Sequence, residues 1–235
     1  MLRFGSNLFF IFCTLGVILG HKQARAAGAF DTLSRDQQLA LLSGNSLSIY
    51  PPTQSWPKCQ IYQWVPTTPE EAAGIFFDYS LQKNYVHRVA KSDILPTRLG
   101  AKTSEIAYGL RLAPLLATFF PAPEYRVFSH IDRISSTVPG YEVRWNLSKT
   151  GFFKDLKGAA RFEPVEDGTL ISYWSVLEPS YLPYALAPSY VIEAMKRGCR
   201  EALESVATHI KAVKVENPEY VEERVRVLNS TLGSP

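Results

Sequence analysis

The clearest fold signal lies in residues 151–184, which read GFFKDLKGAARFEPVEDGTLISYWSVLEPSYLPY. Alternating apolar and polar residues predict two strands in this stretch, near 154–164 and 169–178. The tetrapeptide Glu-Asp-Gly-Thr, residues 166–169, separates them, and Asp-Gly suits the positive backbone angles of a two-residue turn. We therefore expect an antiparallel hairpin here.

A long amphipathic helix is predicted directly after this hairpin, from Pro188 to about Val213. Apolar residues recur along one side of it, and charged residues cover the rest. At ~1.5 Å per residue, such a helix is long enough to cross an entire sheet. The apolar stripe consists of Val191, Met195, Cys199, Ala202, Val206, Ile210 and Val213.

Five further strands are predicted before the hairpin. The segment KCQIYQWVP, residues 58–66, alternates so that Cys59 and Ile61 face away from Tyr62 and Trp64. The other four strands are expected near residues 86–95, 103–112, 124–134 and 140–148.

A short amphipathic helix is expected after the first of these strands. Thr68 can cap its start, Pro69 suits the first helical position, and Glu70 and Glu71 favour the positive end of the helix dipole. Apolar residues then recur at helical spacing, at Ala72, Ile75, Phe76 and Tyr79.

The strand patterns also predict which face of the sheet is apolar. In YEVRWNL, residues 141–147, the odd-numbered positions are apolar or aromatic and the even-numbered positions are polar. In SEIAYGLRL, residues 104–112, the even-numbered positions from 106 onward are apolar or aromatic. An antiparallel sheet with one wet face and one aromatic-rich inner face follows from this alternation.

The predicted order of elements is one strand, a short helix, six strands and a long helix. This is the order of an α+β helix-grip fold, in which a curved antiparallel β-sheet is wrapped around a long C-terminal α-helix. Two stretches resemble the START-like (SRPBCC) superfamily of the polyketide cyclase/dehydrase and lipid-transport type. One is TPEEAAGIFFDYSLQKNYVHRVAKSDIL, residues 68–95, where a helix ending in Asp-Tyr leads to a strand. The other is residues 151–184. The resemblance covers residues 58–213.

This superfamily includes lipid and sterol carriers, coenzyme-Q-binding proteins, polyketide cyclases and plant hormone receptors. The resemblance implies a lipid or other hydrophobic small molecule held between the sheet and the C-terminal helix, and aromatic walls with a few hydroxyl groups suit such a ligand. These side chains could equally fill the interior as core. The candidate ligand-binding residues are Tyr108, Leu110, Trp145, Tyr173, Tyr190, Val191 and Met195.

An apolar insertion, LAPLLATFFPAPE at residues 112–124, occurs where a plain hairpin is expected. Its large apolar residues could form a lid at the cavity mouth or a transient membrane contact. The alternative, slightly favoured, is that the segment covers part of its own domain. The lid or membrane-contact candidates are Leu115, Leu116, Phe119 and Phe120.

Catalytic motifs are absent from the sequence: it has no Gly-x-Ser-x-Gly elbow, P-loop or dinucleotide fingerprint. His87, His130 and His209 lack the spacing of a metal site, so we expect no metal and no cofactor. The parity of its strand is expected to turn His130 away from the interior.

We therefore expect a non-enzymatic binding or transfer protein. Two alternatives remain. A polyketide cyclase/dehydrase-like enzyme would need little more than a shaped pocket and a polar group such as Tyr108, Tyr173 or Arg111 to polarise a carbonyl. An interaction protein would have a filled core.

Residues 1–26 have the organisation of a secretory signal peptide: the basic start MLRFGSN, the thirteen-residue apolar run LFFIFCTLGVILG, and small residues in ARAA. The alternative is an uncleaved anchor, but this run is shorter than the ~20 residues that span a bilayer as a helix. We expect cleavage near Ala26 or Ala27, and a periplasmic or secreted protein.

Removal of residues 1–26 leaves 22 basic and 22 acidic side chains, and this formal neutrality argues against a nucleic-acid partner. We expect a monomer. Cys59 and Cys199 remain, and they could form a disulfide or stay as buried thiols. The expected organisation is a signal peptide (1–26), an N-terminal helix and linker (27–57), the START-like domain (58–213) and a C-terminal tail (214–235).

Overall fold

The computed structural model describes residues 28–50, 58–96, 99–111, 124–134, 140–149, 153–180 and 188–233, with side chains in the last range described from Ile192 onward. Three predictions fall outside these residues. They are the signal peptide, the lid or membrane-contact segment, and the side chains of Tyr190 and Val191.

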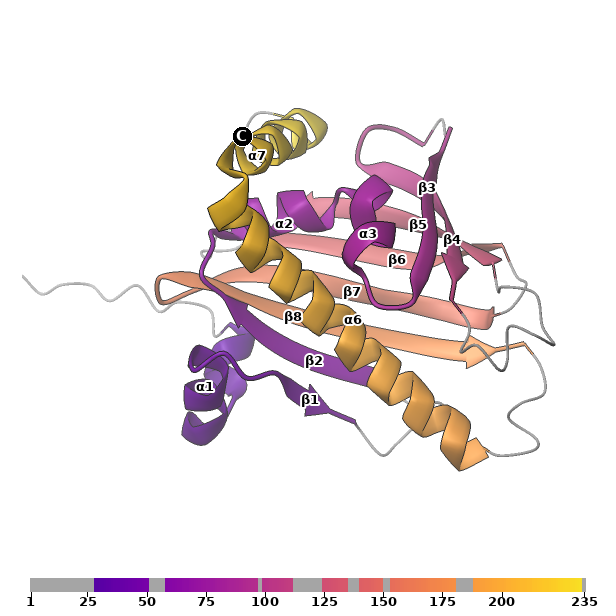
Figure 1. Cartoon of the computed structure of the whole chain (residues 1–235), viewed down its shortest axis with the longest axis horizontal. Coiled ribbons are helices and arrows are strands. Elements are labelled where there is room, and N and C mark those ends of the chain that lie inside the picture. The colour runs from indigo at the N-terminus through magenta and orange to yellow at the C-terminus, as the bar shows by residue number, and fades with distance from the viewer. Residues whose placement is uncertain are drawn as a thin grey trace, which may run out of the picture.

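The described strands form one antiparallel sheet of eight strands in the order β1-β2-β8-β7-β6-β5-β4-β3. This order brings the first strands of the chain beside the last, and the predicted hairpin lies near the centre (Figure 1). The strands are β1 (Leu47–Ile49), β2 (Lys58–Val65), β3 (Val89–Leu95), β4 (Thr103–Leu110), β5 (Glu124–Arg133), β6 (Tyr141–Lys149), β7 (Phe153–Val165) and β8 (Gly168–Pro179).

The helices occupy two sides of this sheet. The long helix α6 runs diagonally across the inner face, which α2 and α3 also cover (Figure 1). Helix α1 packs against the opposite, outer face, where Leu41 meets Tyr62 and Leu170. The helices are α1 (Arg35–Leu42), α2 (Pro69–Phe76), α3 (Gln82–Tyr85), α6 (Pro188–Glu216) and α7 (Pro218–Leu232), with short 3-10 turns η1 (Ala29–Thr32) and η2 (Tyr79–Leu81). The α+β helix-grip prediction is confirmed.

Local sequence signals explain where two of these helices begin. Thr68 Oγ1 accepts a hydrogen bond from the Glu71 backbone N–H at 3.2 Å. In return, the Glu71 carboxylate accepts a hydrogen bond from the Thr68 backbone N–H. Ser34 and Gln37 form the same reciprocal pair at the start of α1. Each box satisfies backbone donors that the first helical turn cannot.

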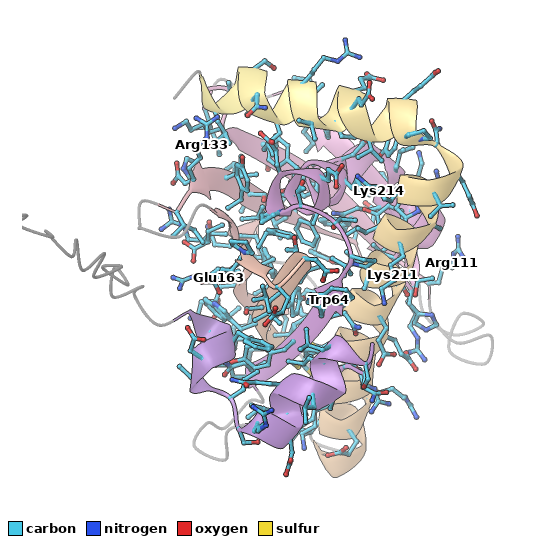
Figure 2. All side chains as sticks on the ribbon, turned by 90° about the vertical axis from the view of Figure 1, so that its left-hand side faces the viewer. Trp64, Arg111, Arg133, Glu163, Lys211 and Lys214 are labelled. Carbon is cyan, nitrogen blue, oxygen red and sulfur yellow. The ribbon has the colours of Figure 1, made fainter. Side chains whose placement is uncertain are left out.

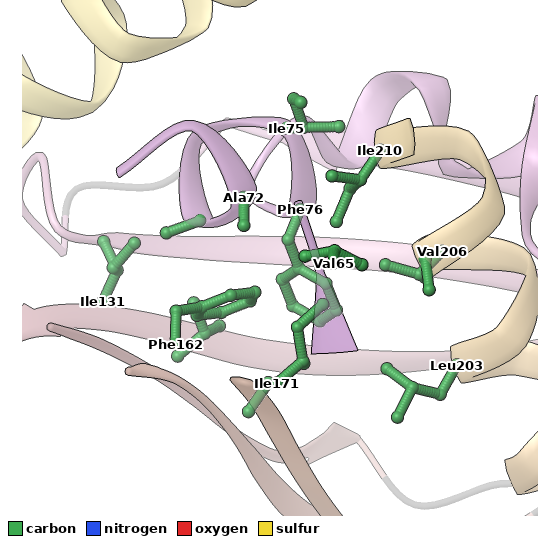
Figure 3. Packing of buried hydrophobic residues seen from close by; sticks show 14 of the residues in the cluster. Val65, Ala72, Ile75, Phe76, Ile131, Phe162, Ile171, Leu203, Val206 and Ile210 are labelled. Carbon is green, nitrogen blue, oxygen red and sulfur yellow. The ribbon is translucent and has the colours of Figure 1, made fainter. Parts of the chain in front are cut away.

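The main core lies between the inner face and the helices. Phe162 and Ile171 from the sheet pack with Phe76 of α2 and with Leu203 and Ile210 of α6 (Figure 3). The predicted alternation of β2 is confirmed, because Cys59 and Ile61 belong to this core whereas Tyr62 and Trp64 belong to the outer cluster under α1.

The hairpin turn differs from the prediction by one residue. Glu166 and Asp167 form the turn, and Glu166 has a positive φ of 51°. Gly168 is already in β8, where an added Cβ would lie 2.5 Å from the Val65 carbonyl oxygen and 2.6 Å from the Trp64 ring. Glycine is required there by the close approach of β2, which the local sequence does not reveal.

The buried stripe of α6 is also shifted from the predicted one. Cys199, Val206 and Ile210 are buried as expected, but Leu203 and Ala207 complete the stripe while Ala202 is only half-buried. The core-facing surface is therefore centred about one residue further along the helix.

The predicted tail is an ordered helix. The Asn217 side chain caps the start of α7, and Val221, Leu228 and Leu232 are buried in the main core. Arg133 reaches α7 from the sheet, donating to the Gly233 carbonyl at 2.8 Å (Figure 2). Within the described residues, none of the helices has the length and apolar character needed to cross a membrane.

Candidate ligand-binding face of the sheet

Trp145 of β6 lies at the centre of the inner face. Its ring centroid is 5.3 Å from that of Tyr173 on β8 and 6.4 Å from that of Phe76 on α2. The indole contacts both the main core and a second apolar cluster built around Ile106 and Phe153. Trp145 therefore joins the two halves of the inner face.

Gly158 on β7 makes room for this indole. It is the cross-strand partner of Trp145. A Cβ added at Gly158 would lie 2.4 Å from Cζ2 of Trp145 and 2.4 Å from the carbonyl oxygen of Trp174. Only glycine allows the indole to lie this close to the sheet.

A second aromatic group lies on β4 and β5. The rings of Tyr108 and Tyr125 stack with centroids 5.3 Å apart, and Tyr125 meets Phe153 edge-on at 5.1 Å. The Tyr108 hydroxyl donates to Oε1 of Gln82 at 2.6 Å, which ties the stack to α3. The ring surfaces of this group form an aromatic wall with a fixed orientation.

These tyrosines are neutral hydrogen-bonding groups. Burial raises the pKa of Tyr108 and Tyr173 well above the ordinary value, and it raises the pKa of Tyr125 as well. Tyr108, Tyr125 and Tyr173 nevertheless keep part of their surface accessible, as does Trp145. These aromatic residues of the inner face are therefore only partly buried, although their hydroxyl groups are poorly solvated.

Charged side chains are missing from the middle of this face. By strand alternation the inner positions are 106–110 on β4, 125–131 on β5, 143–147 on β6, 156–162 on β7 and 171–177 on β8, taken every second residue. All of these are apolar, aromatic, glycine or serine. Because an unpaired buried charge is costly, such a surface favours an uncharged ligand.

The structure brings together most of the described candidate residues. Leu110 belongs to the cluster of Tyr108, and Trp145 contacts Tyr173. Met195 on α6 is half-buried but belongs to neither of the two inner-face clusters. The carbonyl-polarising candidate Arg111 is exposed at the end of β4 (Figure 2).

Several residues of this face are not among the ligand-binding candidates predicted from the sequence. Tyr125, Phe153 and Leu177 belong to the same cluster as Tyr108, and the hydroxyl of Tyr79 hydrogen bonds with that of Ser129 inside it. Strand alternation could have added Tyr125 and Leu177. Tyr79 follows the predicted helical spacing, but α2 ends at Phe76 and Tyr79 lies in the 3-10 turn η2. Its hydrogen bond with Ser129 joins distant segments, which helical spacing does not predict.

The two cysteines of the expected mature chain both lie in the main core. Both are free thiols and both are buried, Cys59 on β2 and Cys199 on α6. Contact with the Cys59 thiol, together with burial, raises the pKa of Cys199 well above its ordinary value.

The histidines lie apart from the inner face. His130 faces outward as predicted, with Nδ1 2.8 Å from the Thr103 hydroxyl and Nε2 2.9 Å from Asp132. His209 stacks on Tyr85 with centroids 3.9 Å apart. Across the described part of the chain, no cluster of three or more potential metal ligands occurs.

Asp132 is part of a charged group on the outer face. Partial burial opposes its ionisation, but His130, Lys102 and Arg144 outweigh this effect and lower the pKa of its carboxyl. The outer face is therefore wet and charged beside the same strands that carry aromatic residues on the inner face.

Comparison with known proteins identifies the fold. No family model matches the chain, and a search of curated proteins gives no match. Among solved structures, human StAR-related lipid transfer protein 5 aligns with a TM-score of 0.57 and 11% identity, over 73% of this chain and 84% of that chain. The chain has a START-like helix-grip fold.

Other structures share this START-like fold. A STAR-related lipid transfer protein from Xanthomonas axonopodis aligns with a TM-score of 0.54 and 14% identity, over 71% of this chain and 92% of that chain. The Zhui aromatase/cyclase from Streptomyces sp. R1128 aligns with a TM-score of 0.51 and 10% identity, over 66% and 94%. Lipid transfer proteins and an aromatase/cyclase both occur among these structures, so the shared fold does not decide between a carrier and an enzyme.

Proposed function

We propose that this protein binds an uncharged hydrophobic molecule on the inner face of its START-like sheet and transfers it without chemical change. The observation that carries the proposal is the uncharged aromatic surface around Trp145, Tyr108 and Tyr173, three residues that are only partly buried although they pack against the inner-face clusters. A packed core would bury these rings completely.

The chemistry of the surface favours a particular kind of ligand. Trp145 and Tyr173 offer ring faces to a flat apolar molecule, and aromatic contacts of this kind add to simple area burial. The inner positions offer hydroxyls and no counter-ion. A neutral molecule with a hydroxyl or carbonyl group therefore suits this face better than one with an ionised headgroup.

The surroundings of two residues that could polarise a carbonyl, Tyr108 and Arg111, favour transfer over a cyclase-like reaction. The Tyr108 hydroxyl is already bonded to Gln82, and Arg111 is exposed to solvent. Neither group is poised to polarise a carbonyl bound beside Trp145.

Native mass spectrometry of gently purified protein, followed by solvent extraction, tests the proposal. We expect a co-purified neutral lipid that is released intact. A Trp145→Ala variant should retain less of it, whereas Trp174→Ala, on the opposite face of the sheet, should retain as much as the natural protein. An empty protein that also fails to take up a neutral fluorescent hydrophobe would contradict the proposal.

We also propose that the protein is exported and that residues 113–123 touch a membrane during transfer. The support is the sequence: the signal-peptide pattern in residues 1–26 and the large apolar side chains Leu115, Leu116, Phe119 and Phe120. Burial of each such side chain contributes ~1.5–3 kcal/mol, enough for weak reversible attachment.

Flotation with neutral liposomes tests the membrane contact. The natural protein should rise with the vesicles, and a Leu116→Ser, Phe119→Ser double variant should stay at the bottom of the gradient. Equal behaviour of the two proteins would rule out the contact. Sequencing the amino terminus of protein recovered outside the cytoplasm tests cleavage near Ala26 or Ala27.

A further inference from the structure

A buried carboxylate oxygen on the outer face of the sheet has no hydrogen-bond partner. Glu163 of β7 pairs across the strands with Leu170, so both side chains point to the outer face, where Leu170 belongs to the cluster under α1. Oε2 of Glu163 is buried, and no described group donates a hydrogen bond to it. Because burying a charge without a partner is costly, this carboxylate favours a positively charged hydrogen-bond donor nearby.

The start of η1 lies beside this carboxylate (Figure 2). A Cβ added to Gly28 would lie 3.8 Å from Oε1 of Glu163 and 3.9 Å from Oδ2 of Asp31. The Gly28 N–H donates a hydrogen bond to the same aspartate oxygen at 3.0 Å. Phe30 fixes this segment, because its side chain packs against the outer cluster and its carbonyl accepts a hydrogen bond from Gln38 at 3.0 Å. Two carboxylates therefore border the backbone at the beginning of the described chain.

Neither of these two carboxylates is paired with a cation. Among the ion pairs formed by the described residues, none includes Asp31 or Glu163. Arg161 is two residues from Glu163 on β7, but its Nε bonds to Oε1 of Glu142 at 2.6 Å. A cation can instead arise on the chain itself, immediately before Gly28.

Signal-peptide cleavage would create that cation. Ala24 and Ala26 have the spacing of small residues that signal peptidase requires, so hydrolysis of the peptide bond after Ala26 makes Ala27 the first residue. One water molecule is added, which leaves a carboxylate on Ala26 and an ammonium group on Ala27. Because adjacent Cα atoms are only ~3.8 Å apart, the Ala27 nitrogen is within reach of both carboxylates beside Gly28.

We propose that Glu163 and Asp31 bind the α-ammonium group of Ala27 after cleavage and so fix η1 and α1 on the outer face of the sheet. This rests on the export part of the proposed function. Before cleavage the Ala27 nitrogen belongs to a neutral amide, which has no charge to pair with the carboxylates. Hydrogen bonds between an ammonium group and a carboxylate are about twice as strong as neutral ones. The processed protein should therefore be more stable than its precursor.

Chains with defined amino termini test this contact without any ligand. One chain begins at Ala27, after removal of a fusion partner, and the other carries Gly-Ser before Ala27, which moves the ammonium group by up to about 7 Å. We expect the melting temperature of the chain that begins at Ala27 to be higher by about 2–4 °C. This difference should disappear in Glu163→Gln. Asp36→Asn, which removes an exposed carboxylate from the first turn of α1, should leave it unchanged.

Two results would overturn the contact: equal melting temperatures of the two chains with Glu163 present, or a difference that persists in Glu163→Gln. The two amino termini are compared within each variant, so the comparison stands even if Glu163→Gln is less stable overall. Amino-terminal sequencing of exported protein is a separate measurement. An intact precursor there would overturn the proposed export, whereas the contact measured on the chains with defined amino termini would still be supported.

Discussion

At the residue scale, the inner face depends on a pairing of the largest side chain with the smallest. Trp145 lies against the sheet because its cross-strand partner Gly158 has no side chain. The indole then reaches Tyr173 and Phe76 at once. A methyl group at position 158 would meet both the indole and a backbone carbonyl, and the carbonyl cannot move without disturbing the ladder between β7 and β8.

A Gly158→Ala variant should lower the free energy of unfolding by about 1–3 kcal/mol, the usual cost of overpacking. The matched control is Gly198→Ala, because Gly198 is within α6 and has no atom within 4 Å of an added Cβ. Alanine there should stabilise the helix by about 0.5–1 kcal/mol. Urea unfolding of both variants provides the comparison, and equal effects would contradict the packing argument.

At the element scale, α7 is held by a buried ion pair. Nη1 of Arg224 donates to Oδ2 of Asp78 at 3.0 Å, and the Tyr220 hydroxyl donates to the same oxygen at 3.1 Å. Gly74 of α2 allows the helices to approach, since an added Cβ would lie 3.1 Å from the Arg224 backbone. These contacts fix the carboxy-terminal helix over α2, next to the end of α6.

An Arg224→Met variant should therefore lose about 3 kcal/mol of stability, because it leaves the buried Asp78 carboxylate without its cation. Arg226 lies on the exposed side of the same helix, so Arg226→Met should change stability by less than about 0.5 kcal/mol. Thermal unfolding compares the two. Similar losses would mean that the charge of α7, rather than the buried pair, holds the helix.

The sequence predicted elements better than their ends. Strand alternation placed Trp145 and Tyr173 on the inner face because the period of a strand is local. The turn at Glu166 and the need for glycine at position 168 depend on β2, which lies far away in the sequence. The sequence predicts only a C-terminal tail at 214–235, because helix α7 is held by its packing against α2, which is a tertiary contact. The hydrogen bond between Gln82 and Tyr108 could not be predicted, because a single polar residue forms no periodic pattern.

At the scale of the whole molecule, stability depends on pH through the junction of α6 with α3. Burial lowers the pKa of His209, and the nearby Asp78 opposes this only in part. The folded protein thus binds fewer protons at this site than the unfolded chain does, so the stability contributed by neutral His209 is present above the ordinary value of 6.5 and is lost as the pH falls below it.

A His209→Phe variant keeps an aromatic ring against Tyr85 but has no proton to gain. Between pH 7.5 and pH 5, roughly one unit or more on either side of the ordinary histidine value, its stability should fall less than that of the natural protein. Urea midpoints at the two pH values measure the difference. Parallel losses in both proteins would show that acid acts elsewhere.

The outer face of the sheet is covered differently in its two halves. Leu41 of helix α1 and the preceding residue Leu33 cover the outer face of β2 and β8, whereas β5 and β6 present Asp132 and Arg144 to water on that face. Among the described residues, the first half thus lies between two apolar layers, and no such layer covers the outer face of the second half. If the sheet deforms around a bulky guest, the uncovered half should deform more, and its amide hydrogens should exchange first.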